Sequence, residues 1–321
     1  MHKGTEEILL DGFSVWRRNK KIAVPYLLKM IVQALLLGVC IFSIVFIFFQ
    51  QVSFDPANIS DYQSLLRQAF TPILILSALL IGFGFILVSA LVSAYFDAGA
   101  IGMARKAVES GETSIDYMTE YGIRRFPSLF LARLLVNIAS FIPLLLLGAA
   151  VLVIGAVAFA INVYVLVATV LSIVFAAAPY FIVIAGSGAI EGLEKSCLLL
   201  KENKKPYMLL WIFGNYVGEY ANSLAVLIAG VVFALGLLVI PIELHITSAY
   251  SLYDPSLIRY LTSLLFSLLT LGAISVASAI LALTLIFVLI VSPLTTVWWT
   301  ELYMDKTETH RIGQDRIHRH G

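Results

Sequence analysis

The residue with the clearest potential for chemistry is Glu219, a carboxylate inside a long apolar run from Tyr207 to Pro241. Helical periodicity places Asn215, four residues earlier, and Asn222, three residues later, on the same face as Glu219. An ionisable group within a bilayer is costly, so such groups usually serve a function or pair with one another. These three side chains are therefore candidates for an intramembrane polar site.

Arg133 is a second ionisable residue within an apolar run, and Asn137 follows it one helical turn later. Arg133 lies roughly 9 Å past Pro127, and Glu219 lies roughly 12 Å past Trp211, at about 1.5 Å per residue. Because these depths are similar, we expect Arg133 and Glu219 to pair between helices. Two interpretations stay open, a structural pair that fixes helix packing and a transport or proton-relay site.

Other residue types give no sign of catalysis. The sequence contains no HExxH, GxSxG or Walker A motif and no paired intramembrane aspartates. His318 and His320 lie in a short tail that lacks further metal ligands. We therefore expect a non-enzymatic protein with no catalytic residues, no metal site and no cofactor.

The elements that must position these residues are hydrophobic helices. Hydrophobic residues make up 60% of the 321 and charged residues 13%, against roughly 45–50% and about 25% in soluble domains. Six apolar runs each exceed the roughly 20 residues that cross a bilayer. We predict an all-α, polytopic transmembrane helical bundle over 1–304 as a single six-helix domain, followed by a cytoplasmic tail at 305–321. The predicted spans are approximately 22–49, 71–96, 128–158, 161–185, 207–241 and 257–299, the last as one kinked helix.

The distribution of basic residues predicts the orientation. Of 21 Lys and Arg residues, this layout leaves only Arg67 and Arg259 outside, while Lys29 and Arg133 lie just inside the inner ends of their spans. The positive-inside rule then places both termini in the cytoplasm of a multi-pass cell-membrane protein. The net charge of +1, with no basic domain outside the membrane flanks, argues against a nucleic-acid partner.

Three segments place basic residues ahead of an apolar run, and this repetition predicts three hairpins in parallel. Each hairpin is expected to be preceded by cytoplasmic amphipathic segments, with linking helices at 5–18, 98–110, 114–122 and 188–202. The alternative is that every inner boundary is simply basic. The segments are Asn19-Lys20-Lys21 before Pro25-Tyr26-Leu27-Leu28, then Arg124-Arg125-Phe126-Pro127, then Asn203-Lys204-Lys205-Pro206-Tyr207-Met208-Leu209-Leu210, of which the first and third match best.

The region joining the fourth and fifth spans resembles a known family. It contains Pro179-Tyr180-Phe181-Ile182-Val183-Ile184, Glu191-Gly192-Leu193-Glu194-Lys195-Ser196 and Lys201-Glu202-Asn203-Lys204-Lys205. These motifs are similar to those of the glycerophosphodiester phosphodiesterase membrane domain and its stand-alone prokaryotic relatives. The resemblance implies a six-helix membrane domain without catalysis, because the phosphodiesterase chemistry of the fused proteins belongs to a separate soluble barrel.

These observations favour a permease-like or accessory protein that moves or accommodates a small or lipidic substrate. The alternative is a scaffold or assembly factor that binds a protein partner through its cytoplasmic amphipathic helices. The lipid bilayer is the expected environment, and Gly214 and Gly218 form a GxxxG pattern that could support a homo-oligomer. Cys40 and Cys197 are expected as free thiols on opposite sides of the membrane, and Asn58 begins a glycosylation sequon in the outer loop.

Overall fold

The computed structural model describes most of the first two thirds of the chain and one C-terminal helix. The described residues are 4–51, 71–154, 157–212, 214, 223, 226–228, 278, 282, 285–286 and 288–306. All regular secondary structure within these ranges is helical, with no strand among them. The predicted all-α class is confirmed.

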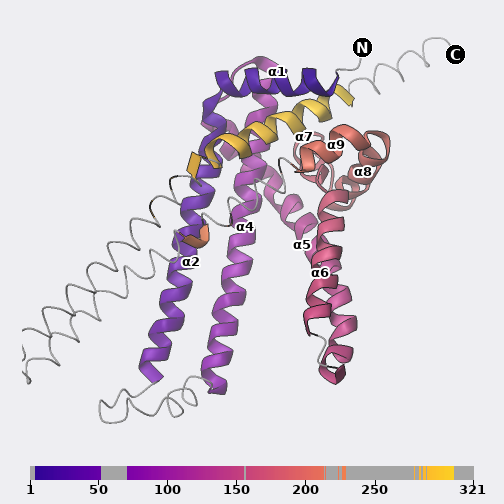
Figure 1. Cartoon of the computed structure of the whole chain (residues 1–321). Coiled ribbons are helices and arrows are strands. Elements are labelled where there is room, and N and C mark those ends of the chain that lie inside the picture. Colours follow the sequence, from indigo (N-terminus) through magenta and orange to yellow (C-terminus); the bar gives the residue numbers. More distant parts are fainter. Residues whose placement is uncertain are drawn as a thin grey trace, which may run out of the picture. The chain divides into compact units, whose positions relative to one another are not determined.

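The described part of the chain is a succession of helices (Figure 1). A helical segment at 288–306 completes the described part. The others are α1 (Thr5–Arg18), the 3₁₀ helix η1 (Lys20–Ala23), α2 (Val24–Gln51), α4 (Pro72–Ser110), α5 (Ile115–Ile154), α6 (Val157–Val174), α7 (Ala178–Ile184), α8 (Ala189–Glu202) and α9 (Lys204–Leu210).

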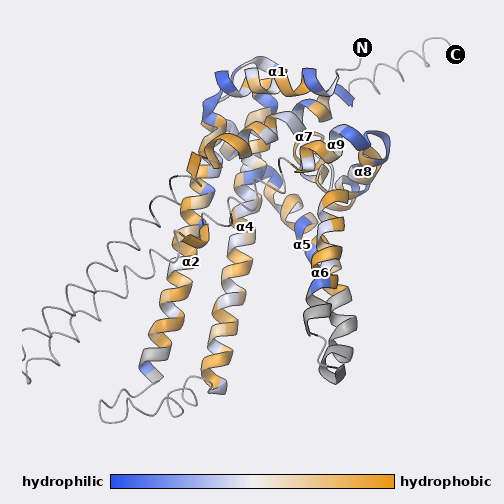
Figure 2. Cartoon of the chain, viewed as in Figure 1, coloured by the Kyte–Doolittle hydropathy of each residue, from blue (hydrophilic) through white to orange (hydrophobic). Residues whose placement is uncertain are grey.

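Four stretches within the described residues are long and apolar enough to cross a membrane. They are Lys20–Ile47, Pro72–Ser110, Ile115–Ile142 and Asn162–Ile184, and Figure 2 shows the apolar character of these helices. They coincide with the first four predicted spans, so the transmembrane class is confirmed. Most of the predicted fifth and sixth spans lies outside the described residues, and six spans stay a prediction.

Two of the predicted linking helices are not separate elements. The segment expected at 98–110 is the end of α4, and the segment expected at 114–122 is the start of α5, which continues through Pro127. The junction at 96–98 contains no Gly or Pro, and Gly122 and Pro127 do not interrupt α5, whereas the turn between α4 and α5 falls at Gly111, whose φ is +80°. The linking helices predicted at 5–18 and 188–202 are present as α1 and α8.

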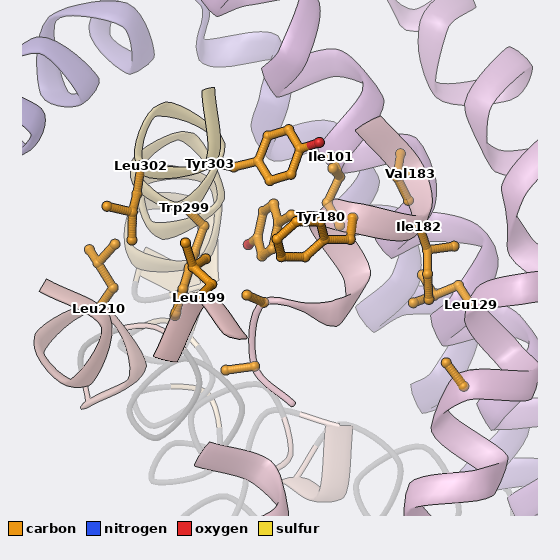
Figure 3. Close-up of a cluster of buried hydrophobic side chains, with 14 of the residues drawn as sticks. Ile101, Leu129, Tyr180, Ile182, Val183, Leu199, Leu210, Trp299, Leu302 and Tyr303 are labelled. Carbon is orange, nitrogen blue, oxygen red and sulfur yellow. The ribbon is translucent and has the colours of Figure 1, made fainter. Parts of the chain in front are cut away.

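The described residues fall into two compact units. The first comprises Met1–Lys29, Ser93–Ala221 and Phe287–Gly321, and the second comprises Met30–Val92 and Asn222–Ile286. The core of the first unit gathers buried side chains from α4, α5, α7, α8, α9 and the helix at 288–306 (Figure 3). Trp299 lies at its centre, with the ring of Tyr207 edge-on at 4.9 Å and the ring of Tyr180 stacked at 5.7 Å.

Small residues bring α4 and α5 close together within the first unit. A Cβ on Gly99 would lie 2.7 Å from the Met118 side chain, and one on Gly102 would lie 2.3 Å from the Tyr121 ring. Membrane helices associate largely through such close packing, because lipid offers no hydrophobic contrast. Polar side chains on α4 can therefore lie close to polar side chains on α5.

The second unit contains the part of α2 that follows Lys29 and the part of α4 that precedes Ser93. Gln33 joins the two by donating a 3.0 Å hydrogen bond to the Ser89 hydroxyl. Large apolar side chains elsewhere on these helices are exposed, among them Leu79 at 65% and Phe83 at 67%. Exposed apolar surface of this kind is expected of helices that face lipid.

The fourth predicted span is broken at Phe175–Ala177, between α6 and α7. In the first unit, Ser196 of α8 donates 2.9 Å to the Val174 carbonyl, and Tyr207 of α9 donates 3.1 Å to the same oxygen. Both hydroxyls also accept from the Ala177 amide at 3.2 Å. Backbone groups freed by a helix break must be satisfied when no water is present. Ser196 and Tyr207 therefore stabilise the break and fasten α8 and α9 to it.

We expect Ser196→Ala and Tyr207→Phe each to cost about 1 kcal/mol of unfolding free energy, because the remaining hydroxyl still serves Val174 and Ala177. The double variant should cost more than the sum, since both buried backbone groups then lose their side-chain partners. Reversible unfolding of the detergent-solubilised protein measures this. Thr169→Ala, on the exposed side of α6, is the matched control, and additive costs would contradict the shared role.

Candidate functional site

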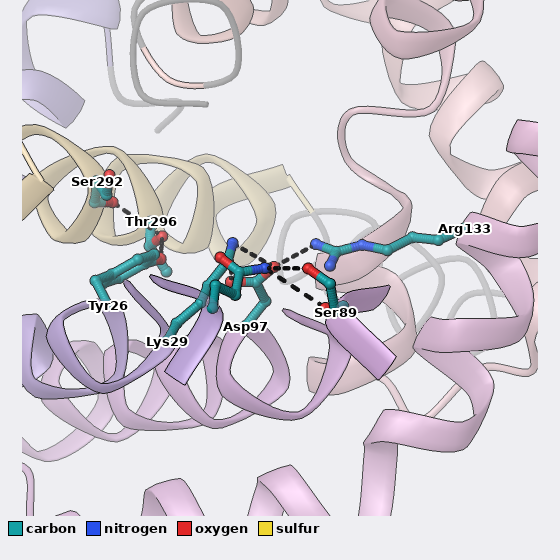
Figure 4. Close-up of polar contacts among 8 residues, drawn as sticks. Tyr26, Lys29, Ser89, Asp97, Arg133, Ser292 and Thr296 are labelled. Carbon is teal, nitrogen blue, oxygen red and sulfur yellow. Dashed lines mark hydrogen bonds and ion pairs between the residues drawn. The ribbon is translucent and has the colours of Figure 1, made fainter. Parts of the chain in front are cut away.

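A buried carboxylate held by two cations forms the candidate site, which lies within the first unit. Lys29 Nζ lies 3.1 Å from Asp97 Oδ1 and 3.3 Å from Oδ2, and an Arg133 guanidinium nitrogen lies 2.6 Å from Oδ2 (Figure 4). The distances correspond to charge-assisted hydrogen bonds, and the Arg133 bond is especially short. We call Lys29, Asp97 and Arg133 the ion triad.

Three different helices supply the triad. Lys29 lies in the second turn of α2, Asp97 lies two thirds of the way along α4, and Arg133 lies in the middle of α5. The side chains of Lys29 and Asp97 are 4% and 10% exposed, whereas that of Arg133 is 32% exposed. All three lie within stretches long and apolar enough to span a membrane. A charge removed from water in this way is tolerated only when it is paired.

A hydrogen bond close to the ion triad joins α2 to a fourth helix, the one at 288–306. Tyr26 lies three residues before Lys29, and its hydroxyl contacts the Thr296 hydroxyl on the helix at 288–306. Thr296 donates its own proton to the Ser292 carbonyl at 3.1 Å. Tyr26 is therefore the donor toward Thr296, since a hydroxyl has a single proton. Figure 4 shows these contacts beside the triad.

Two other arginines of the first unit have a structural role. Arg105 donates to the Ile184 carbonyl at 3.0 Å, and Arg125 donates to the Gly186 carbonyl at 3.4 Å. Ile184 is the last residue of α7, where free carbonyls and the negative end of the helix dipole attract cations. These arginines stabilise the connection from α7 to α8.

The sequence analysis identified one member of the triad as a site residue. Arg133 belongs to it, while Asn137, one turn further along α5, is exposed. Asn215, Glu219 and Asn222 lie outside the described residues. A guanidinium carries five N–H donors, so its bond to Asp97 leaves room for a second carboxylate, and pairing with Glu219 stays a prediction.

Sequence analysis missed Asp97 and did not assign Lys29 to the site. Asp97 lies between the second predicted span, which ends at 96, and the linking helix predicted at 98–110, so it was assigned to neither. One signal was available, because Asp97 is the first charged residue after Arg67. Lys29 lies seven residues past Ile22, the predicted inner end of its own span, whereas Asp97 lies one residue beyond the end of its predicted span.

The described residues contain no group of three or more His, Cys, Asp or Glu side chains placed to hold a metal ion. Cys40 and Cys197 are both free thiols, as predicted. The tail histidines and the Asn58 sequon lie outside the described ranges, and the lack of a cofactor stays a prediction.

No protein-family model, no curated protein and no solved structure matches the chain. The resemblance to the glycerophosphodiester phosphodiesterase membrane domain therefore rests on the short motifs between 179 and 205 alone.

We expect Asp97→Asn to lower the unfolding free energy by about 3–5 kcal/mol, because it leaves Lys29 and Arg133 without their shared carboxylate. Arg133→Gln should cost less, since that side chain is one third exposed and Asp97 keeps Lys29. Thermal and denaturant unfolding in detergent would rank the variants. Glu109→Gln is the control, because it breaks a partly exposed ion pair with Arg105 that is worth at most about 1 kcal/mol. Equal losses for Asp97→Asn and Glu109→Gln would contradict this ranking.

Proposed function

We propose that this chain is a non-enzymatic, multi-pass protein of the cell membrane that moves or accommodates a small or lipidic substrate, with the ion triad at its functional centre. The observation that carries the proposal is a carboxylate bound by two cations from separate helices inside membrane-spanning segments. Ionisable residues in such segments are rare and commonly mark substrate or proton pathways. The six-span layout of the glycerophosphodiester phosphodiesterase membrane domain is part of the same proposal.

The partial exposure of Arg133 supports an active role over a purely structural one. An ion cluster that only fixes helix packing gains nothing from a partly exposed arginine side chain. Arg133 keeps 32% of its side chain exposed while it bonds to Asp97. Its planar group can therefore meet a polar or anionic group of a substrate without first leaving the carboxylate.

A scaffold or assembly factor is the second candidate. It is favoured by exposed apolar residues on helices outside the four spans, namely Leu10 (71%) and Phe13 (47%) on α1 and Ile190 (74%) on α8. Surface of this kind can also bind a protein partner or a second copy of the chain. The two functions predict different results for a folded variant that lacks the ion triad, because transport should be lost in such a variant whereas a scaffold role does not need the triad.

The deciding variant replaces the triad with apolar residues of similar size, Lys29→Met, Asp97→Leu and Arg133→Met together. Replacing a whole buried ion cluster in this way is often neutral for stability, so the variant should fold. We expect the wild-type protein in liposomes to accelerate proton flux or the flip-flop of a fluorescent phospholipid. The triple variant should lose at least roughly tenfold of that rate, about 1.4 kcal/mol of barrier.

Ser140→Ala is the matched control, since it removes a buried polar group of α5 whose hydrogen bond among the described residues is to Val136 of the same helix. Monodisperse elution and unchanged helicity show that each variant is folded. Equal fluxes from the wild-type and triple variants would remove the transport proposal and favour the scaffold.

The proposed orientation can be tested by cysteine labelling. In a background with Cys40→Ser and Cys197→Ser, we expect Ser60→Cys to react with an impermeant maleimide in intact cells. Ser14→Cys, at an exposed position of α1, should react only after the membrane is permeabilised. The reverse pattern would place the termini outside.

A further inference from the structure

Two distant segments of the first unit have the same local structure. Helices α1 and α8 each contain 14 residues. Each begins after an extended glycine, Gly4 with φ −67° and ψ 159°, and Gly188 with φ −67° and ψ 170°. Each ends at an asparagine in the same conformation, Asn19 with φ −116° and ψ 54°, and Asn203 with φ −127° and ψ 48°. The first and third predicted repeats thus share geometry as well as sequence.

The burial of side chains follows the same order along both helices. Ile8 and Gly12 are buried in α1, as are Gly192 and Ser196 at the equivalent positions of α8. Exposed positions also coincide, with Glu7, Leu10, Ser14, Arg17 and Arg18 matched by Glu191, Glu194, Leu198, Lys201 and Glu202. The two helices therefore present the same face to the protein and the same face to the outside.

The asparagine forms a corner at the end of each helix. Asn19 Nδ2 donates to the Val15 carbonyl at 3.1 Å and to the Gly111 carbonyl at 2.9 Å, and Asn203 Nδ2 donates to the Leu199 carbonyl at 3.4 Å. The same two carbonyls also accept the backbone N–H groups of Asn19 and Asn203, at 3.0 and 2.9 Å, so each asparagine bonds to its helix end through both its backbone and its side chain. Two exposed lysines follow each corner, Lys20 with Lys21 and Lys204 with Lys205. We call these segments, Arg17–Lys21 and Lys201–Lys205, the basic corners.

Each helix is docked on its inner face, which leaves its outer face uncovered by the described residues. A Cβ on Gly12 would lie 2.4 Å from Trp298, whose indole donates 2.9 Å to the Leu9 carbonyl. A Cβ on Gly192 would lie 2.6 Å from the Ile182 side chain. The outer faces carry Leu10 and Phe13 on α1 and Ile190 and Leu198 on α8, all at least 47% exposed.

Charge is arranged along α1 in a way that suits an anionic surface. Two of its three acidic residues, Glu6 and Glu7, lie in the first turn and Asp11 lies in the middle, while Arg17 and Arg18 lie in the last turn and are followed by Lys20 and Lys21. Exposed apolar side chains next to a cluster of cations are typical of helices that lie at the headgroup level of anionic bilayers. The second corner is less basic, because it contains Glu202.

Lys195, further back on α8, does not belong to the corner. It donates 2.6 Å to Glu191 and 3.2 Å to Ser187. The bond from Lys195 lowers the pKa of the Glu191 carboxyl below its ordinary value. This cation is already neutralised by its own helix, whereas the corner lysines extend beyond the last turn.

We propose that the two basic corners are equivalent binding sites for the headgroups of anionic phospholipids, one at the end of α1 and one at the end of α8. The lysine ammonium groups contact the phosphate, and the exposed apolar residues of the preceding helix contact the acyl chains. The middle repeat has no such site, because Arg124 and Arg125 lie inside the continuous helix α5. The proposal is independent of the ion triad and of transport.

Native mass spectrometry of the full chain in detergent, titrated with phosphatidylglycerol or phosphatidylcholine, tests the sites. We expect two phosphatidylglycerol molecules to bind ahead of any further ones, and phosphatidylcholine to show no such preference. Lys20→Gln with Lys21→Gln should weaken one of the two binding events by roughly tenfold or more, at about fivefold per lysine near a surface. Lys204→Gln with Lys205→Gln should weaken the other event, and the fourfold variant should lose both.

The matched control is Lys106→Gln with Arg124→Gln, which removes the same charge from sites outside the corners. Unchanged binding in this control supports the corners. An equal loss in the control and in the corner variants would overturn the proposal in favour of diffuse attraction by a basic surface. No loss in any variant would overturn it as well and assign the outer faces to a protein partner. Displacement of phosphatidylglycerol by inorganic phosphate at matched ionic strength would show a site for free anions instead.

Discussion

A carboxylate on an apolar helix must find a cation, and this requirement organises the described part of the protein. Asp97 satisfies it with Lys29 from the preceding hairpin helix and Arg133 from the following one. Neither bond can form unless α2, α4 and α5 approach one another at the depth of Asp97. Gly99 and Gly102, within two turns of Asp97, allow α5 to come close enough. The ion triad and the small-residue packing therefore depend on each other.

The same requirement, applied to the backbone, explains the arrangement of α6 to α9. The break between α6 and α7 frees the Val174 carbonyl and the Ala177 amide in surroundings without water, and hydroxyls from α8 and α9 bond to both. Burial is nearly complete here, with Ser196 and Tyr207 at 0% exposure. Because the break is satisfied only when α8 and α9 are docked, we infer that both helices fold together with α6 and α7.

The sequence was informative where structure is local and uninformative where it is tertiary. The bounds of α1 were predicted at Thr5–Arg18 because its apolar periodicity, acidic first turn and basic last turn all occur within the 14 residues of the helix. The four described spans were likewise readable from length and composition. Asp97 was missed because nothing local shows that α4 continues as one helix beyond its apolar run. The partner of Arg133 could not be predicted from the sequence either, since the depth of a residue along its helix does not show which neighbouring helix its side chain faces.

The three predicted repeats differ in which feature they carry, a cation of the ion triad or an asparagine corner. The first and second repeats each carry a cation soon after an entry proline, Lys29 after Pro25 and Arg133 after Pro127, and both cations meet on Asp97. The first and third repeats instead share the asparagine corner. The second repeat lacks the asparagine. Its span begins within α5, which is continuous from the turn after α4, and this unbroken helix places Arg133 next to Asp97. A corner at Arg125, like that at Asn19, would end the preceding helix and let the span reorient, so the absence of a corner in this repeat helps to set the geometry of the triad.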